Sequence, residues 1–171
     1  MYEERFRGLR SYFKELELEE KKLKEEKIKK HQRIKQGIIE VFSSKVEVIC
    51  KGFAKGVEWK YRQWKVEDLK KYLKFDEEGL AWGCEIIKPG FSGGDRIRVS
   101  LWTSGRIHVF GEKALENLGG TWNSEPHRGI TIPLDVDSGT FDENAFIQAL
   151  EEEYKGIVRH ELYLKRLFSN K

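Results

Sequence analysis

The chain has 171 residues and a mass of 20.1 kDa, enough for one domain with a hydrophobic core or for a smaller domain with a helical extension. Charged residues make up 36% of it, yet 32 lysines and arginines against 29 aspartates and glutamates leave a net charge of only +3. This balance argues against a protein that coats nucleic acid by overall charge, so any nucleic-acid site must be a local patch.

The two cysteines indicate the cellular compartment. Cys50 and Cys84 each lie in an apolar run without a CxxC or Cys/His spacing, which predicts buried free thiols in a reducing environment and no metal site. The N-terminus has no apolar signal region, and no run approaches the roughly 18 apolar residues of a membrane span. We expect a cytoplasmic protein that has no cofactor and does not contact membranes. Its Lys/Glu richness, with one Met and two Cys, resembles the composition of thermophile proteins.

Residues 3–42 are rich in helix-forming residues and contain no proline, which predicts one long helix or two helices joined near Gly37. Apolar side chains follow a coiled-coil a/d pattern with Glu20 as a polar gap. These residues, which we expect to mediate oligomerisation, are Phe6, Leu9, Phe13, Leu16 and Leu23. We therefore expect residues 1–44 to form a coiled-coil-like arm that makes the protein a homo-oligomer. The alternative is a solvated single helix stabilised by pairs such as Glu20 with Lys24.

Residues 45–171 are expected to form an α+β domain. Ser43-Ser44 ends the helical pattern, and alternation of apolar and polar residues predicts strands at 45–50 and 57–62. A short helix over 66–73 and a strand from Leu80 to Ile87 follow, the strand ending before Pro89-Gly90.

Residues 96–110 read as two strands joined at a Ser104-Gly105 turn. Because successive strand side chains alternate, one face is apolar and the other mixes basic and aromatic groups. The apolar face holds Ile97, Val99, Leu101, Ile107 and Val109, and the reverse face holds Arg96, Arg98, Ser100, Trp102, Arg106, His108 and Phe110.

The C-terminal third of the domain contains a helical turn at 112–118, a long loop over 119–139 with a short strand at 130–134, and a final helix. Thr140-Phe-Asp-Glu143 has the form of a capping box that opens this helix, which extends to about Phe168. The predicted fold is therefore α+β: an antiparallel sheet of four or five strands packed on the C-terminal helix, extended by the N-terminal arm.

The basic-aromatic hairpin face is the main functional signal, because cations that meet phosphates beside rings that stack on bases suit sequence-tolerant nucleic-acid binding. We expect a non-enzymatic, oligomeric nucleic-acid-binding protein, with DNA and RNA not distinguished. In this interpretation the phosphates meet Arg96, Arg98 and Arg106, and the bases meet Trp102 and His108.

Two alternatives stay open. Arg and aromatic residues are also enriched at protein interfaces, so the chain could be a structural or assembly protein that binds a protein partner through its arm and aromatic face. Glu58-Trp59-Lys60 is the acid-and-lysine half of a metal-dependent nuclease site, although the second carboxylate is missing upstream.

Overall fold

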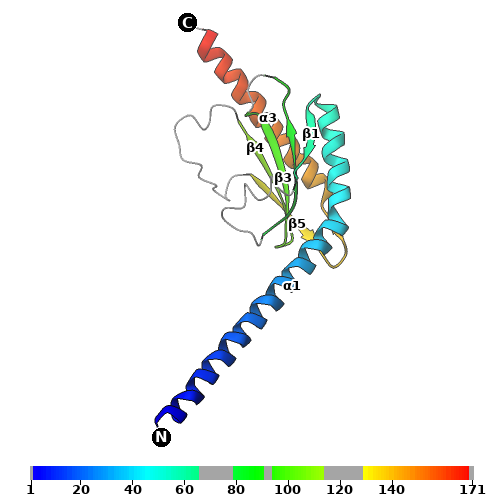
Figure 1. Ribbon diagram of the computed structural model, residues 1–171. Helices are drawn as coiled ribbons and strands as arrows, with labels where there is room; N and C mark the ends of the chain where they lie inside the picture. The colour runs from blue at the N-terminus through cyan, green and yellow to red at the C-terminus, as the bar shows by residue number, and fades with distance from the viewer. Residues whose placement is uncertain (1, 66–78, 91–93, 114–128, 170–171) are drawn as a thin grey trace. The chain divides into compact units, whose positions relative to one another are not determined.

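A computed structural model describes residues 2–65, 79–90, 94–113 and 129–169 (Figure 1). The elements are α1 (Tyr2–Gly56), β1 (Lys60–Gln63), β2 (Leu80–Ile87), β3 (Arg96–Trp102), β4 (Arg106–Glu112), β5 (Ile130–Asp135), β6 (Thr140–Phe141) and α3 (Glu143–Ser169). The chain divides into two compact units, residues 1–34 and residues 35–171. This division falls before the expected boundary at 44/45, which stays a prediction about independent folding.

Six strands within the described residues form one antiparallel sheet in the order β1-β2-β3-β4-β5-β6. Together with the described helices α1 and α3, this sheet confirms the predicted α+β class and has one or two strands more than expected. The β3–β4 hairpin forms as predicted: Val99 pairs with Val109, and Gly105 in the turn has a φ of 76°. That left-handed conformation favours glycine over residues with a Cβ.

One face of the sheet forms the core of the second unit. Ile97, Val99, Leu101, Ile107 and Val109 are fully buried, as the alternation pattern predicted. Helix α3 packs across β3, β4 and β5, behind them in Figure 1, and contributes Phe146, Leu150 and Ile157 to the same core cluster.

The predicted strand at 45–50 is wrong, because α1 continues through these residues to Gly56. The structure buries a stripe with a spacing of four: Ile38, Phe42, Val46, Cys50 and Ala54. This spacing places the side chains on one helix face, where their burial outweighs the small helix penalty of a β-branched residue such as Val46. Only the last part of the predicted second strand is extended, as β1.

The start of α3 also differs from the prediction. Asp142, rather than Thr140, caps the helix: its carboxylate accepts a hydrogen bond from the Ala145 amide at 2.9 Å, and its carbonyl accepts one from the Phe146 amide at 3.0 Å. Thr140 instead lies in β6, a strand the sequence pattern did not predict, whereas the expected strand at 130–134 is confirmed as β5.

Three other expectations concern residues outside the described ranges: the short helix at 66–73, the helical turn beyond Lys113, and the loop over 119–128. Glu112, where that turn was expected to begin, is the last residue of β4. Among the helices of the described residues, none combines the length and apolar character that a membrane crossing requires.

Candidate binding face of the sheet

The side of the sheet opposite the core carries the charged and aromatic side chains of the predicted site. We call it the polar face. Its residues are Arg62 from β1, Glu85 from β2, Arg96, Arg98, Ser100 and Trp102 from β3, and Arg106, His108, Phe110 and Glu112 from β4. All five predicted nucleic-acid-binding residues therefore lie on one face, as the alternation of the hairpin requires.

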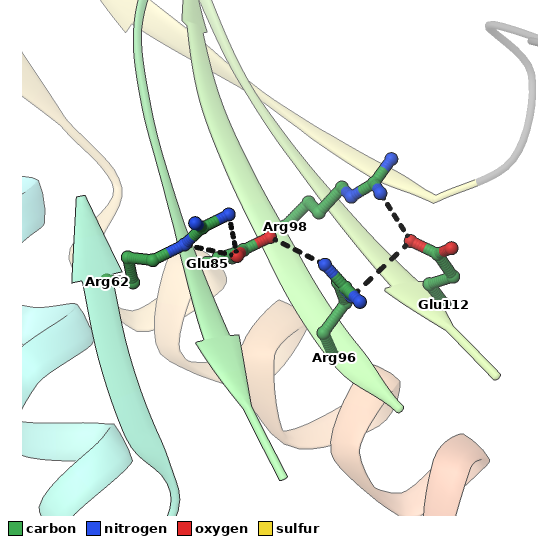
Figure 2. A network of polar contacts seen from close by, with 5 residues as sticks. All are labelled: Arg62, Glu85, Arg96, Arg98 and Glu112. Atoms are coloured by element: carbon green, nitrogen blue, oxygen red, sulfur yellow. Dashed lines mark hydrogen bonds and ion pairs between the residues drawn. The ribbon is translucent and has the colours of Figure 1, made fainter. Parts of the chain in front are cut away.

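A chain of ion pairs crosses four strands of this face (Figure 2). The Arg62 guanidinium donates from Nε to Glu85 Oε1 at 2.7 Å, and its Nη2 lies 2.6 Å from the same oxygen. The other Glu85 oxygen accepts a hydrogen bond from Arg96 Nη1 at 3.2 Å. Glu85 thus bridges two arginines that are 34 positions apart in the sequence.

Glu112 continues the chain of ion pairs on β4. Its Oε2 lies 2.7 Å from Arg98 Nη2 and 3.8 Å from Arg96 Nε. Strand register explains these contacts: Arg62 is directly opposite Glu85 and Arg96 is opposite Glu112, while the Glu85–Arg96 and Arg98–Glu112 pairs are diagonal neighbours on the same face.

Burial makes this network a structural element of the sheet. The Glu85 side chain is 0% exposed, and the side chains of Arg96 and Arg98 are 19% and 17% exposed. A buried carboxylate is stable in its charged form only when charged partners and hydrogen bonds replace water. Arg96 and Arg98 supply charge to these two glutamates, which differs from the expected role of meeting phosphates.

The turn end of the hairpin is organised differently. Trp102 Nε1 donates a hydrogen bond to Ser100 Oγ at 2.9 Å, which fixes the indole along the strand. The exposed Arg106 guanidinium lies over the Trp102 ring, 5.6 Å from its centroid. Farther along β4, the His108 and Phe110 rings stack with an interplanar angle of 7°. The turn end of the face therefore combines three part-exposed aromatic rings with one exposed cation.

Sequence reasoning missed the two glutamates as partners of the arginines. The available signal was that Glu85 interrupts an otherwise apolar strand. Alternation places its side chain on the other face of the sheet from its neighbours Cys84 and Ile86, which are buried in the core. Trp82, on the same strand as Glu85, packs in the core cluster and so does not belong to the polar face.

Other candidate groups are placed separately. Glu58 lies two residues beyond the end of α1 and has a φ of 61°, and Lys60 begins β1. Within residues 2–65, 79–90, 94–113 and 129–169, no three His, Cys, Asp or Glu residues are grouped as a metal site. Cys50 and Cys84 are buried free thiols as predicted, and burial raises the pKa of the Cys84 thiol.

The five arm residues that are expected to mediate oligomerisation are all exposed. Phe6, Leu9 and Phe13 are 61%, 62% and 62% exposed, and Leu16 and Leu23 are 44% and 58% exposed. An ion pair between Glu20 and Lys24, at 2.8 Å, matches the expected stabilisation within a single helix and lowers the pKa of Glu20.

Comparison with known proteins found no matching family model, no matching curated protein and no matching solved structure.

Proposed function

We propose that the protein is a self-associating assembly protein in which the arm, residues 2–34, joins copies of the chain. The observation that supports this most strongly is the exposure of its apolar stripe, where Phe6, Phe13 and Leu23 are each more than half exposed. Large apolar side chains repeated at coiled-coil spacing on a helix gain free energy when a partner helix removes them from water. A contiguous exposed apolar surface is typical of an interaction site.

Sedimentation velocity on the full chain tests this proposal. We expect a species of at least twice the 20.1 kDa chain mass at micromolar concentration, dissociating on dilution. A 20.1 kDa monomer across the whole concentration range would contradict the proposal.

We propose nucleic-acid binding by the polar face as a second function, because the contact of exposed Arg106 with Trp102 favours it. Among the ion pairs of the described residues, Arg62 and Arg96 contact Glu85, and Arg98 contacts Glu112. In this proposal Arg106 meets phosphate and Trp102 stacks on a base, while Arg96 and Arg98 support the face through their glutamate partners.

Fluorescence anisotropy with single- and double-stranded DNA and RNA at two salt concentrations tests this second function. Arg106→Ala should weaken binding and reduce the salt dependence by about one ion, since each phosphate contact releases about one counterion. Trp102→Ala should cost about 1–3 kcal/mol with the salt dependence nearly unchanged. Arg159→Ala, which removes an exposed arginine from α3, is the matched control. Absence of wild-type binding at low salt, or equal loss in the control, would contradict this function.

Two alternative functions stay open, a metal-dependent nuclease activity and binding of a different protein. Among the described residues, neither alternative has a separate candidate site. If the polar face binds no oligonucleotide, a pull-down that depends on Trp102 becomes the test of a protein partner.

A further inference from the structure

The arm carries two adjacent blocks of opposite charge within one helix. Residues 7–14 contain three bases, Arg7, Arg10 and Lys14, and no acid. Residues 15–20 contain four acids, Glu15, Glu17, Glu19 and Glu20, and no base. The boundary between the blocks lies between Lys14 and Glu15, in the middle of the apolar stripe from Phe6 to Leu23.

A parallel, in-register pair of arms would place each block beside its own copy. Basic residues would then face basic residues and acidic residues would face acidic residues. Glu20, which occupies a seam position, would meet Glu20 of the second copy. Like charges at this spacing are destabilising, most of all where the seam excludes water.

An antiparallel pair centred between Lys14 and Glu15 reverses this pattern, because residues 9–14 of each copy lie beside the acidic residues 15–20 of the other copy. The seam layers then join Phe13 to Leu16 and Phe6 to Leu23. Leu9 meets Glu20 in the one mixed layer. Arg10 flanks Glu17 of the second copy at the edge of the seam, so charge complementarity and apolar contact select the same register.

We propose that the arm binds a second copy of this chain as an antiparallel helix pair centred between Lys14 and Glu15. This inference rests on the proposed self-association and specifies its partner, orientation and register. The seam covers the 18 residues from Phe6 to Leu23, about 27 Å of helix at 1.5 Å per residue. All five residues of the predicted oligomerisation stripe lie in it.

Disulfide trapping on the full-length protein tests the orientation. In the antiparallel register, positions 9 and 20 of opposite copies are neighbours, whereas the two copies of position 20 are separated by eleven residues, about 16 Å. Disulfide formation requires Cβ atoms about 4 Å apart. Leu9→Cys/Glu20→Cys should therefore cross-link on mild oxidation, and neither single variant should. The wild type controls for Cys50 and Cys84, which are fully buried.

The outcomes separate the two proposals. Efficient cross-linking of Glu20→Cys alone would overturn the antiparallel orientation while leaving self-association intact, and a dimer that traps in none of the variants would overturn the register. A monomer in sedimentation would overturn the proposed self-association itself. As an independent measurement, the dimer dissociation constant should rise between about 0.05 and about 0.5 M NaCl, because salt screens attractive pairs. A constant that falls with salt would contradict the charge-block pairing.

Discussion

Glu85 lies fully buried on the polar face between the guanidinium groups of Arg62 and Arg96. Replacing this carboxylate with the neutral amide in Glu85→Gln keeps the volume but removes the negative charge that the two arginines share. Loss of one partner from a buried ion pair costs about 3–5 kcal/mol. We expect Glu85→Gln to lower the free energy of unfolding by about 3 kcal/mol in urea denaturation.

Glu152→Gln is the matched control for this variant. Glu152 pairs with Lys155 at 3.2 Å on the surface of α3, with 59% of its side chain exposed. Surface pairs of this kind contribute little, so its denaturation midpoint should match the wild type. Equal midpoints for Glu85→Gln and Glu152→Gln would show that the network does not stabilise the sheet.

Glu161 links α3 to the end of β2, because it pairs with Lys88, the residue that follows this strand. Hydrogen bonds from Lys88 and then Lys165 hold the pKa of Glu161 below its ordinary value of 4.5. A carboxyl group with a lowered pKa stabilises the fold above its unfolded pKa, and this stability is lost as the pH falls through the folded pKa.

We expect Lys88→Met to raise the pKa of Glu161 in an NMR titration. Asp135 provides an internal control, because its pKa is lowered by the Ser138 amide, which donates to Asp135 Oδ1 at 3.0 Å. A variant in which Glu161 titrates as in the wild type, or in which Asp135 shifts equally, would contradict this assignment.

At the scale of one element, helix α1 contributes residues to both units, because it extends from Tyr2 to Gly56 and the units divide after Ile34. Its residues 35–56 bury a four-residue-spaced stripe in the core, and Phe42 contacts the Phe141 ring, with centroids 6.4 Å apart. The expected domain at 45–171 would lack Ile38 and Phe42, which are both buried.

We expect a 35–171 fragment to unfold cooperatively at a higher temperature than a 45–171 fragment. Loss of a buried phenylalanine alone costs about 3–5 kcal/mol, and exposure of the α3 and β6 surfaces adds to this. Circular dichroism melts of the two fragments measure the difference. Identical midpoints would show that residues 35–44 do not belong to the core.

Local patterns predicted the elements whose partners are nearby in sequence. The turn at Gly105 and the alternation along Arg96–Trp102 and Arg106–Glu112 specify the hairpin and its two faces without knowledge of the rest of the chain. The end of α1 could not be predicted in this way, because Val46 and Cys50 fit two patterns: with Val48 they alternate as in a strand, and with Phe42 they repeat every four residues as on a helix face. In the structure Val46 is buried and Val48 is 70% exposed, as the helix requires. Packing against α3 and the sheet decides between these two readings.

The ion-pair network was unpredictable for a related reason. It depends on the register of β1 with β2 and of β2 with β3, which joins Arg62, Glu85 and Arg96 from three separated strands. Sequence patterns identify the face of each residue and leave its cross-strand neighbour undetermined until the sheet is assembled.

At the scale of the whole molecule, the two units differ in how far their apolar side chains are buried. Residues 35–171 bury theirs between the sheet and helices, whereas residues 1–34 hold large apolar side chains at coiled-coil spacing in exposed positions. A helix with this pattern is marginal in isolation and is stabilised by pairing. We therefore expect the arm to be stabilised by association with a second arm.

Light scattering on the full chain with a matched pair of arm variants tests the proposed self-association. Leu16→Glu places a charge in the apolar stripe, whereas Leu18→Glu places the same charge at an exposed position on the opposite side of the helix; the two leucines are 44% and 54% exposed. We expect the wild type and Leu18→Glu to have at least twice the 20.1 kDa chain mass at micromolar concentration, and Leu16→Glu to be a monomer. A monomeric wild type, or equal association of the two variants, would contradict it.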